Sequence, residues 1–195
     1  MSRRDGRPTY APTSGRFVCS PCRDEATLED ILRFDNRFLA RVAQMTDEEV
    51  LRRFRQCPTA FYCILELLGG RTHLRGYFVI LPLTGECAAA IRRGDITAGK
   101  QIRPTDLVRL NQTSEAAYLS VVCAVGARAR SALIASGIQV VRSLYRNRGT
   151  RYLFARAATG AGAHMLTRLT GQRFAPDGII HEIDVSSYSA ITSSE

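Results

Sequence analysis

An arginine-rich turn separates a long apolar run from a segment with helical periodicity. The turn is GARARS, from Gly126 to Ser131, and the run before it is AAYLSVVCAV. A helix that begins directly after a strand presents unsatisfied N–H groups and the positive end of its dipole, which together attract phosphates. The sequence therefore predicts an anion site at this turn. Its expected elements are the flexible Gly126 and the amides of Arg128, Ala129, Arg130 and Ser131.

The basic character of the chain consists almost entirely of arginine. The net charge is +9, and Lys100 is the only lysine. Guanidinium groups bind phosphates and carboxylates through parallel hydrogen bonds, so the composition favours an anionic ligand. Arginine also replaces lysine in proteins from GC-rich genomes, and the composition alone leaves both explanations open.

Six cysteines are present, and only Cys19 and Cys22 form a close pair, in CSPC. A structural zinc site needs four ligands, and the other cysteines offer no second close pair. No strand of thioredoxin type precedes CSPC, which argues against a redox motif. We therefore expect no metal and mostly reduced thiols.

No stretch of the sequence has the roughly 18 apolar residues of a membrane span. The apolar segment GYFVILPLTG is short and contains Pro82, and the first residues, MSRRDGRPTYAPTSGR, are polar. We therefore expect no membrane contact and a cytoplasmic location.

Helices are predicted where apolar residues recur every three or four positions. TLEDILRFDNRFLARVAQ has this pattern, with Thr27 as its expected cap. A second helix begins at Thr46, with Glu49 at the capping-box spacing. Further helices are expected at Glu86–Arg93, after the arginine-rich turn as far as Gly149, and at TGAGAHMLTRLTG.

Strands are predicted at residues 17–19, TAFYCILELL, HLRGYFVILPLT, AAYLSVVCAV, TRYLFARAA and DGIIHEIDVS. Gly69 and Gly70 predict an antiparallel hairpin, whereas the later alternation of strands and helices predicts parallel neighbours. The wholly apolar run AAYLSVVCAV is expected to be a central strand that is buried on both faces. The pattern indicates an α/β fold with a mixed sheet.

This order of elements resembles that of the GCN5-related N-acetyltransferases, the GNAT superfamily. TLEDILRFDNRF resembles the family's opening helix pair, AAYLSVVCAV its fourth strand, ARSALIASGIQVV the following helix, and YLFARAATGAGAHMLTRLTGQRF its fifth strand and next helix. The resemblance implies a mixed, mostly antiparallel central sheet flanked by helices, with splayed central strands. It also implies one acyltransferase domain at 17–188, between a flexible arm at 1–16 and a polar tail at 189–195.

The resemblance further implies an N-acyltransferase that moves an acetyl or longer acyl group from acyl-CoA to an amine by direct attack. Members hold acetyl-CoA where the fourth and fifth strands splay apart. The pantetheine pairs with the fourth strand, here Val121, Val122 and Cys123, and the pyrophosphate lies on the amides of the next turn. The implied acceptor is an amine on a small molecule or a protein.

The turn departs from the family pattern, Gln/Arg-x-x-Gly-x-Gly/Ala. Aligning Leu133 with the family's helix leucine places Val125 at the first position and Arg128 and Arg130 at the two small ones. Arginine side chains that pointed inward would block the cofactor, whereas outward side chains would leave the amides accessible.

Amine acylation requires loss of a proton from the ammonium group and a proton for the leaving thiolate. Glu66 lies on an early strand, and Glu115 and Tyr118 lie at the start of the central strand. His164 lies one helical turn before Thr167, which occupies the position of the family's tyrosine acid. These four side chains are the candidates for proton transfer.

Other functions remain open at this point. A GNAT-fold protein that has lost acyl-CoA would serve as an interaction or regulatory domain, and the arginines at the glycine positions favour that alternative. A nucleic-acid binder would fit the basic charge, with ARSALIASGIQVVRSLYRNR as a helix-turn-helix. That segment is too apolar and too poor in base-reading Asn and Gln, so nucleic acid is not expected. Edge strands would permit a homodimer.

Overall fold

A computed structural model describes residues 15–38, 45–109, 112–157, 166 and 180–186. The strands are β1 (Arg16–Pro21), β2 (Phe61–Leu68), β3 (Arg71–Leu83), β4 (Ala116–Ala124), β5 (Tyr152–Arg156) and β6 (Ile180–Asp184). The helices are α1 (Glu25–Phe38), α2 (Asp47–Gln56), α3 (Gly85–Arg93) and α4 (Ala127–Arg148). Short 3-10 turns lie at Pro58–Ala60, Gly99–Gln101 and Pro104–Asp106. The predicted helix TGAGAHMLTRLTG falls outside the described residues except for Leu166, as do the polar tail and nearly all of the predicted arm.

The strands form one six-stranded sheet in the order β1-β2-β3-β4-β5-β6. Neighbours are antiparallel except β4 and β5, which are parallel. The predicted mixed, mostly antiparallel sheet is therefore confirmed. Parallel pairing of β5 with β6, which the strand–helix alternation predicted, is wrong, because β6 enters the sheet from the opposite end.

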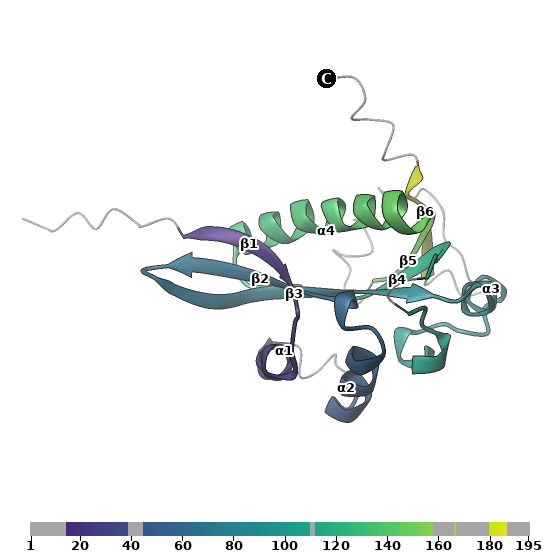
Figure 1. The fold of residues 1–195 in the computed structure, drawn as a ribbon, viewed down its shortest axis with the longest axis horizontal. Coiled ribbons are helices and arrows are strands. Elements are labelled where there is room, and N and C mark those ends of the chain that lie inside the picture. The colour runs from purple at the N-terminus through teal and green to yellow at the C-terminus, as the bar shows by residue number, and fades with distance from the viewer. Residues whose placement is uncertain (1–14, 39–44, 110–111, 158–165, 167–179, 187–195) are drawn as a thin grey trace, which may run out of the picture.

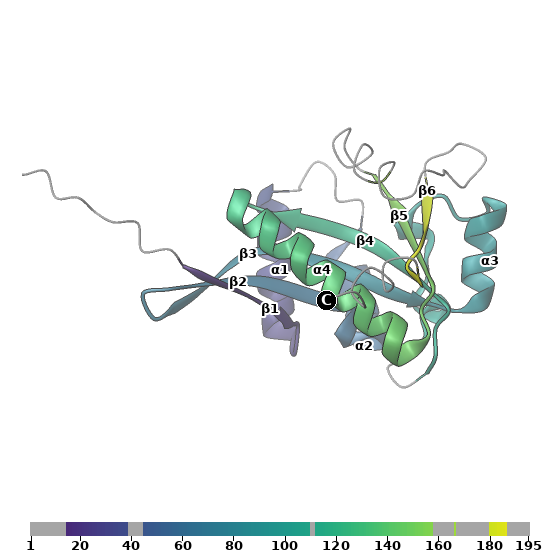
Figure 2. The same cartoon turned by 90° about the horizontal axis from the view of Figure 1, so that it is seen from above.

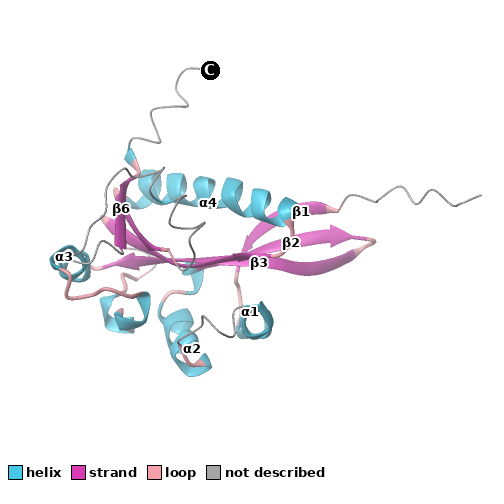
Figure 3. Ribbon diagram, turned by 180° about the vertical axis from the view of Figure 1, so that it is seen from behind, coloured by secondary structure: helices cyan, strands magenta, loops and turns pink. Residues whose placement is uncertain are grey.

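Helices cover both faces of this sheet. Helices α1 and α2 lie against one face and α4 runs along the other (Figure 1), and the view from behind shows the same two layers (Figure 3). Leu28, Ile31 and Phe34 of α1 pack into the core on the first face, whereas Leu133 of α4 packs into the core on the second. The sheet thus lies between two separate cores.

The helix ends follow short capping signals. The capping box of Thr46 and Glu49 at the start of α2 is confirmed, with hydrogen bonds in both directions. The predicted cap at Thr27 is wrong. Helix α1 begins at Glu25, and the Asp24 carboxylate accepts a hydrogen bond from the Thr27 amide over 2.8 Å. Asp24 gave no signal of its own because the apolar pattern of the helix starts only four residues later, at Leu28.

The central strands splay apart along β4. Strand β3 pairs with β4 as far as Ala124, but β5 pairs only with Ala116 to Leu119. Seen from above, β5 diverges from β4 (Figure 2). The expectation that β4 is buried on both faces is wrong for its second half, where Val122 is 45% exposed.

Candidate functional site

A β-bulge marks the point where β4 loses its second partner. Val121 pairs with Val79 and Leu119 pairs with Ile80, so Ser120 is an extra residue in β4. Bulges of this kind increase the local right-handed twist and bend the strand. The bulge therefore turns residues 120–124 away from β5.

The second half of β4 keeps a row of backbone groups facing the missing strand. The amide of Val125 donates to the carbonyl of Arg75 over 2.8 Å. Because backbone groups of an antiparallel strand alternate between its two sides, Val121 and Cys123 also face β3. The amide and carbonyl groups of Val122 and Ala124 then point toward the side that β5 has left. Val121 and Cys123, which the sequence placed in the cofactor site, contribute β3 pairing instead of donors on that edge.

The edge leads directly into the start of α4. Gly126 has φ 93°, a conformation that residues with a side chain rarely adopt. It is the N-cap and offers no capping side chain. The first amide bonded within the helix is that of Arg130, which donates to the Gly126 carbonyl over 3.1 Å. The amides of Ala127, Arg128 and Ala129 thus remain as donors, because a helix cannot satisfy its first N–H groups.

The arginines of the turn point outward. Arg128 and Arg130 are exposed, whereas Ala129 between them is only 2% exposed. Neither arginine forms an ion pair with another described residue. A Cβ atom built on Gly126 would meet no atom within 4 Å, so the turn is open. The small residue required at the inside of the turn is therefore an alanine, and the arginines do not fill the space.

A loop from the segment before β4 packs beside the bulge. A Cβ atom on Gly99 would lie 2.8 Å from Tyr118 Cε1 and 3.4 Å from Ser120 Oγ, so only glycine permits this approach. The buried Arg53 guanidinium on α2 donates to the carbonyls of Gly99 and Ile102 over 2.9 and 2.6 Å. These bonds tie the loop to α2, while Gly99 contacts β4.

The same loop is also tied to β5. Arg156, at the end of β5, donates to the Thr97 carbonyl over 3.1 Å. Burial lowers the pKa of Arg53, with nearby acidic groups opposing the shift. The loop between Thr97 and Ile102 therefore spans the two splayed strands at their point of separation, held by one arginine from α2 and one from β5.

A carboxylate on α1 faces the second half of β4, residues 121–124, which lacks β5 as a partner and is called the open half below. The Tyr77 hydroxyl donates a short hydrogen bond to Asp35 Oδ1, and Tyr77 pairs with Cys123 in the register of β3 and β4. Burial raises the pKa of Asp35, and the Tyr77 hydrogen bond partly opposes this shift. The Asp35 carboxyl is half-buried. A carboxylate with a raised pKa beside a splayed strand can accept a proton.

Sequence reasoning missed Asp35. The helix TLEDILRF presents Leu28, Ile31 and Leu32 on its buried side, and Asp35 follows Leu28 by seven residues on that same side. An acidic residue on the apolar face of a helix was the available signal.

The four predicted proton-transfer residues lie in very different places. Tyr118 lies beside the bulge, where burial raises the pKa of its hydroxyl. Glu66 on β2 forms an ion pair with Arg75 over 2.7 Å. Glu115 is exposed just before β4, roughly 17 Å from Ser120 at ~3.3 Å per residue. His164 lies outside the described residues. Of the three candidates that the structure describes, Tyr118 alone lies next to the second half of β4.

The CSPC pair consists of thiols in the structure. Cys22 is buried, and burial raises its pKa to about 11, so it is protonated at neutral pH. Burial also raises the pKa of Cys19. Across the described ranges, His, Cys, Asp and Glu side chains form no group suited to a metal ion. Of the helices described, none has the length and apolar character to cross a bilayer.

No protein-family model and no curated protein sequence matches the chain. Solved structures do match it in three dimensions. The loading GNATL domain of CurA from Lyngbya majuscula is 12% identical with a TM-score of 0.54, over 73% of this chain and 65% of that one. AtaTR bound with AcCoA is 12% identical with a TM-score of 0.51, over 91% and 98%. The KacTA–DNA complex is 12% identical with a TM-score of 0.50, over 92% and 100%.

These similarities show a shared fold. The chain has the fold of the GCN5-related N-acetyltransferases, as its order of elements indicated. It spans 65% of the CurA loading domain and nearly the full length of the AtaTR chain.

Proposed function

We propose that the protein is an acyl-CoA-dependent N-acyltransferase that moves an acetyl or longer acyl group onto an amine. The observation that carries this proposal is the continuous row of backbone donors from the open half of β4 into the uncapped start of α4. The AtaTR structure with the same fold contains AcCoA, which supports the choice of cofactor.

The pantetheine arm of acyl-CoA would lie along the open edge of β4. Its amide groups would bond to the backbone of Val122 and Ala124 as an added strand would. The pyrophosphate would lie on the amides of Ala127, Arg128 and Ala129, where the helix dipole favours negative charge. Arg128 and Arg130 would add charge from outside the turn.

Asp35 would accept the proton of the attacking amine. The nitrogen forms a bond to the thioester carbonyl carbon, the C–S bond then breaks, and the ammonium proton passes to the Asp35 carboxylate directly or through water. The CoA thiolate leaves and takes up a proton, for which Tyr118 and His164 are the proposed donors. Glu66 and Glu115 remain proposals with weaker support, because Glu66 is ion-paired and Glu115 lies far from the bulge.

Melting curves with and without millimolar acetyl-CoA test this function. A ligand at ~100 times its dissociation constant stabilises the native state by about 2.7 kcal/mol. Gly126→Val should abolish that shift, because a side chain at φ 93° distorts the turn. Gly70→Val, at φ 74° in the β2–β3 hairpin, is the matched control and should keep it.

The alternative is a GNAT-fold protein that acts as an interaction or regulatory domain without acyl-CoA. The absence of any shift with acetyl-CoA or longer acyl-CoAs would favour that alternative. Release of free thiol from acetyl-CoA in the presence of an amine panel would favour the enzyme.

A further inference from the structure

A hollow of about 280 Å³ lies near the C-terminal end of α4, away from the free amides at its start. It opens between the 3-10 turn after α2, strands β2 and β3, and the last turns of α4. Arg148 lines it and lies nineteen residues after Ala129, which at ~1.5 Å per residue places the two roughly 28 Å apart along the helix. The hollow is therefore separate from the proposed acyl-CoA site.

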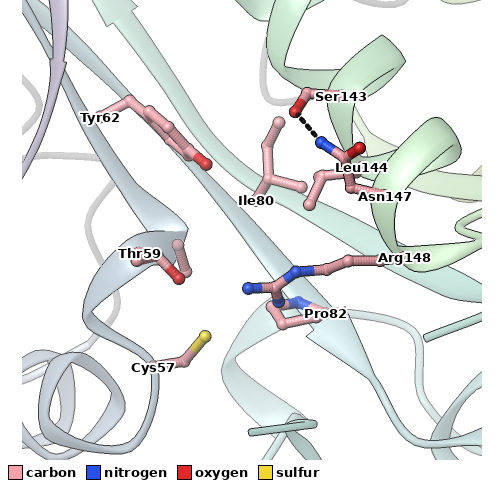
Figure 4. Close-up of a pocket in the computed structure, with 10 residues that line it drawn as sticks. Cys57, Thr59, Tyr62, Ile80, Pro82, Ser143, Leu144, Asn147 and Arg148 are labelled. Atoms are coloured by element: carbon pink, nitrogen blue, oxygen red, sulfur yellow. Dashed lines mark hydrogen bonds between the residues drawn. The ribbon is translucent and has the colours of Figure 1, made fainter. Parts of the chain in front are cut away.

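Polar side chains converge inside this hollow. Figure 4 shows the Arg148 guanidinium and the Tyr62 hydroxyl pointing into it from opposite walls. Within the described part of the chain, neither group has a side-chain hydrogen bond or ion pair. Asn147, by contrast, already donates to Ser143 over 3.0 Å. The hollow thus offers a ligand the guanidinium fork of Arg148 and the hydroxyl of Tyr62, and the hydroxyls of Thr59 and Ser143 also line it.

One wall of the hollow is apolar, although the polar side chains of Thr59 and Ser143 also line it. Ile80 and Pro82 of β3 and Leu144 of α4 contribute hydrocarbon surface. The Tyr62 ring stacks on Phe78 with centroids 4.9 Å apart and planes at 9°. Because stacking fixes the ring, the hydroxyl has a defined position relative to the guanidinium.

Arg148 has an alternative explanation as a cation that complements the helix dipole. Arg146 in the same last turn can serve that purpose from an exposed position. The dipole does not require Arg148 to lie in a hollow opposite a tyrosine hydroxyl. A ligand anion accounts for both its direction and its lack of a partner in the described structure.

We propose that this hollow binds a small carboxylate with a compact apolar body. The carboxylate would receive two parallel hydrogen bonds from the Arg148 fork and one from the Tyr62 hydroxyl. Its hydrocarbon part would contact Ile80, Pro82 and Leu144. The volume lies between the ~150 Å³ cavity that admits benzene and the ~300 Å³ of small drug sites, so a ligand of about ten heavy atoms fits.

The test is an NMR titration of the full chain with sodium benzoate and sodium hexanoate. Inorganic phosphate and benzylammonium chloride distinguish a general anion site and a general apolar site from the proposed one. We expect saturable amide shifts at residues 59–62 and 143–148 with the carboxylates and none with benzylammonium. Phosphate should bind at least tenfold more weakly than benzoate, because it cannot use the apolar wall.

Variants on the same helix give the controls. Arg148→Met should weaken benzoate binding at least tenfold, and Arg148→Lys, which keeps the charge and loses the fork, should weaken it severalfold. Tyr62→Phe should cost a few-fold, and the exposed Arg146→Met should change nothing. A lack of saturable shifts, equal binding by Arg148→Met, or phosphate binding as tight as benzoate would overturn the proposal. Native-like spectra of Arg148→Lys guard against loss of fold as the cause.

Discussion

The two halves of β4 are similarly apolar in sequence, but one half is buried between two strands and the other has a single neighbouring strand. Residues 116–119 pair with both β3 and β5, and Ala116, Ala117 and Tyr118 are buried. Residues 121–124 pair with β3 alone, and Val122 is exposed. The difference arises from one extra residue, Ser120, and from the place where β5 departs.

This comparison places the proposed binding role of the second half in its backbone. Valine and alanine side chains offer no catalytic groups, but their amides and carbonyls on the open side could pair with an extended ligand, as the proposed function requires. The following predictions test this contrast, from the largest expected effect to the smallest.

Removing the carboxylate beside each half of β4 should have the most different effects on activity. Asp35→Asn should lower kcat/KM for the amine by about 10²–10⁴-fold, the usual range for loss of a general base. Glu115→Gln, beside the first half of β4 (residues 116–119), should change kcat/KM by less than about threefold. Steady-state kinetics measure both, and Asp30→Asn on the exposed face of α1 is the control. A larger loss in Glu115→Gln than in Asp35→Asn would contradict the account.

The pH dependence of the reaction should report the same carboxylate. Burial raises the pKa of Asp35, so kcat/KM should fall as the pH drops through a value above the ordinary ~3.9 of aspartate. Asp35→Asn should remove that acidic limb. The raised pKa also means that the native state binds the Asp35 proton more tightly than the unfolded state. The unfolding free energy of the wild type, relative to the variant, should therefore decrease as the pH rises through that pKa.

Proline substitutions should separate the two edges of β4. Val121→Pro removes an amide that faces β3, and it should lower the unfolding free energy by about 1–3 kcal/mol. Val122→Pro removes an amide on the open edge, which tolerates proline as an edge strand does. It should keep the wild-type melting temperature within a few degrees and lose the acetyl-CoA shift. Equal destabilisation by both prolines would contradict the assigned edges.

The loop at the boundary between the halves should depend on Arg53. Arg53→Met removes charge-assisted hydrogen bonds, each of about 1.5–3 kcal/mol, to the carbonyls of Gly99 and Ile102. Urea unfolding should show that loss, and the KM for the amine should rise. Arg52→Met, which breaks an exposed pair with Glu48, should cost no more than about 1 kcal/mol. An Arg53 variant as stable as the Arg52 variant would refute this role.

The arginines of the turn should have the smallest effect. Arg128→Ala and Arg130→Ala should each weaken acetyl-CoA binding only a few-fold, because the amides remain and exposed charges contribute about 0.3–1 kcal/mol. Calorimetric titration at low and high salt should show that the effect shrinks as salt increases. A loss of more than a hundredfold would place these side chains inside the turn.

Much of the fold was predictable from short-range signals. Gly69 and Gly70 predicted the hairpin, the Thr46–Glu49 capping box predicted the start of α2, and Gly149 predicted the end of α4. These features depend on nearby residues alone. The order of elements also predicted the fold.

The site was less predictable. The amides left without an intrahelical acceptor are those of Ala127 to Ala129, whereas the sequence pointed to Arg128 to Ser131, because the start of a helix after a glycine is ambiguous by one or two residues. Asp35 and Arg53 form hydrogen bonds with partners 42 and 46 or more positions away in the sequence. Such pairings depend on the packed tertiary structure and leave no local pattern.

The most direct test of the central claim is an amide NMR titration with acetyl-CoA. The account predicts large saturable shifts for the amides of Val122, Ala124 and residues 127–129, with smaller shifts for Val121 and Cys123. Shifts that are equal across β4, or that are absent at millimolar acetyl-CoA, would contradict the assignment of the open half of β4 as the cofactor site.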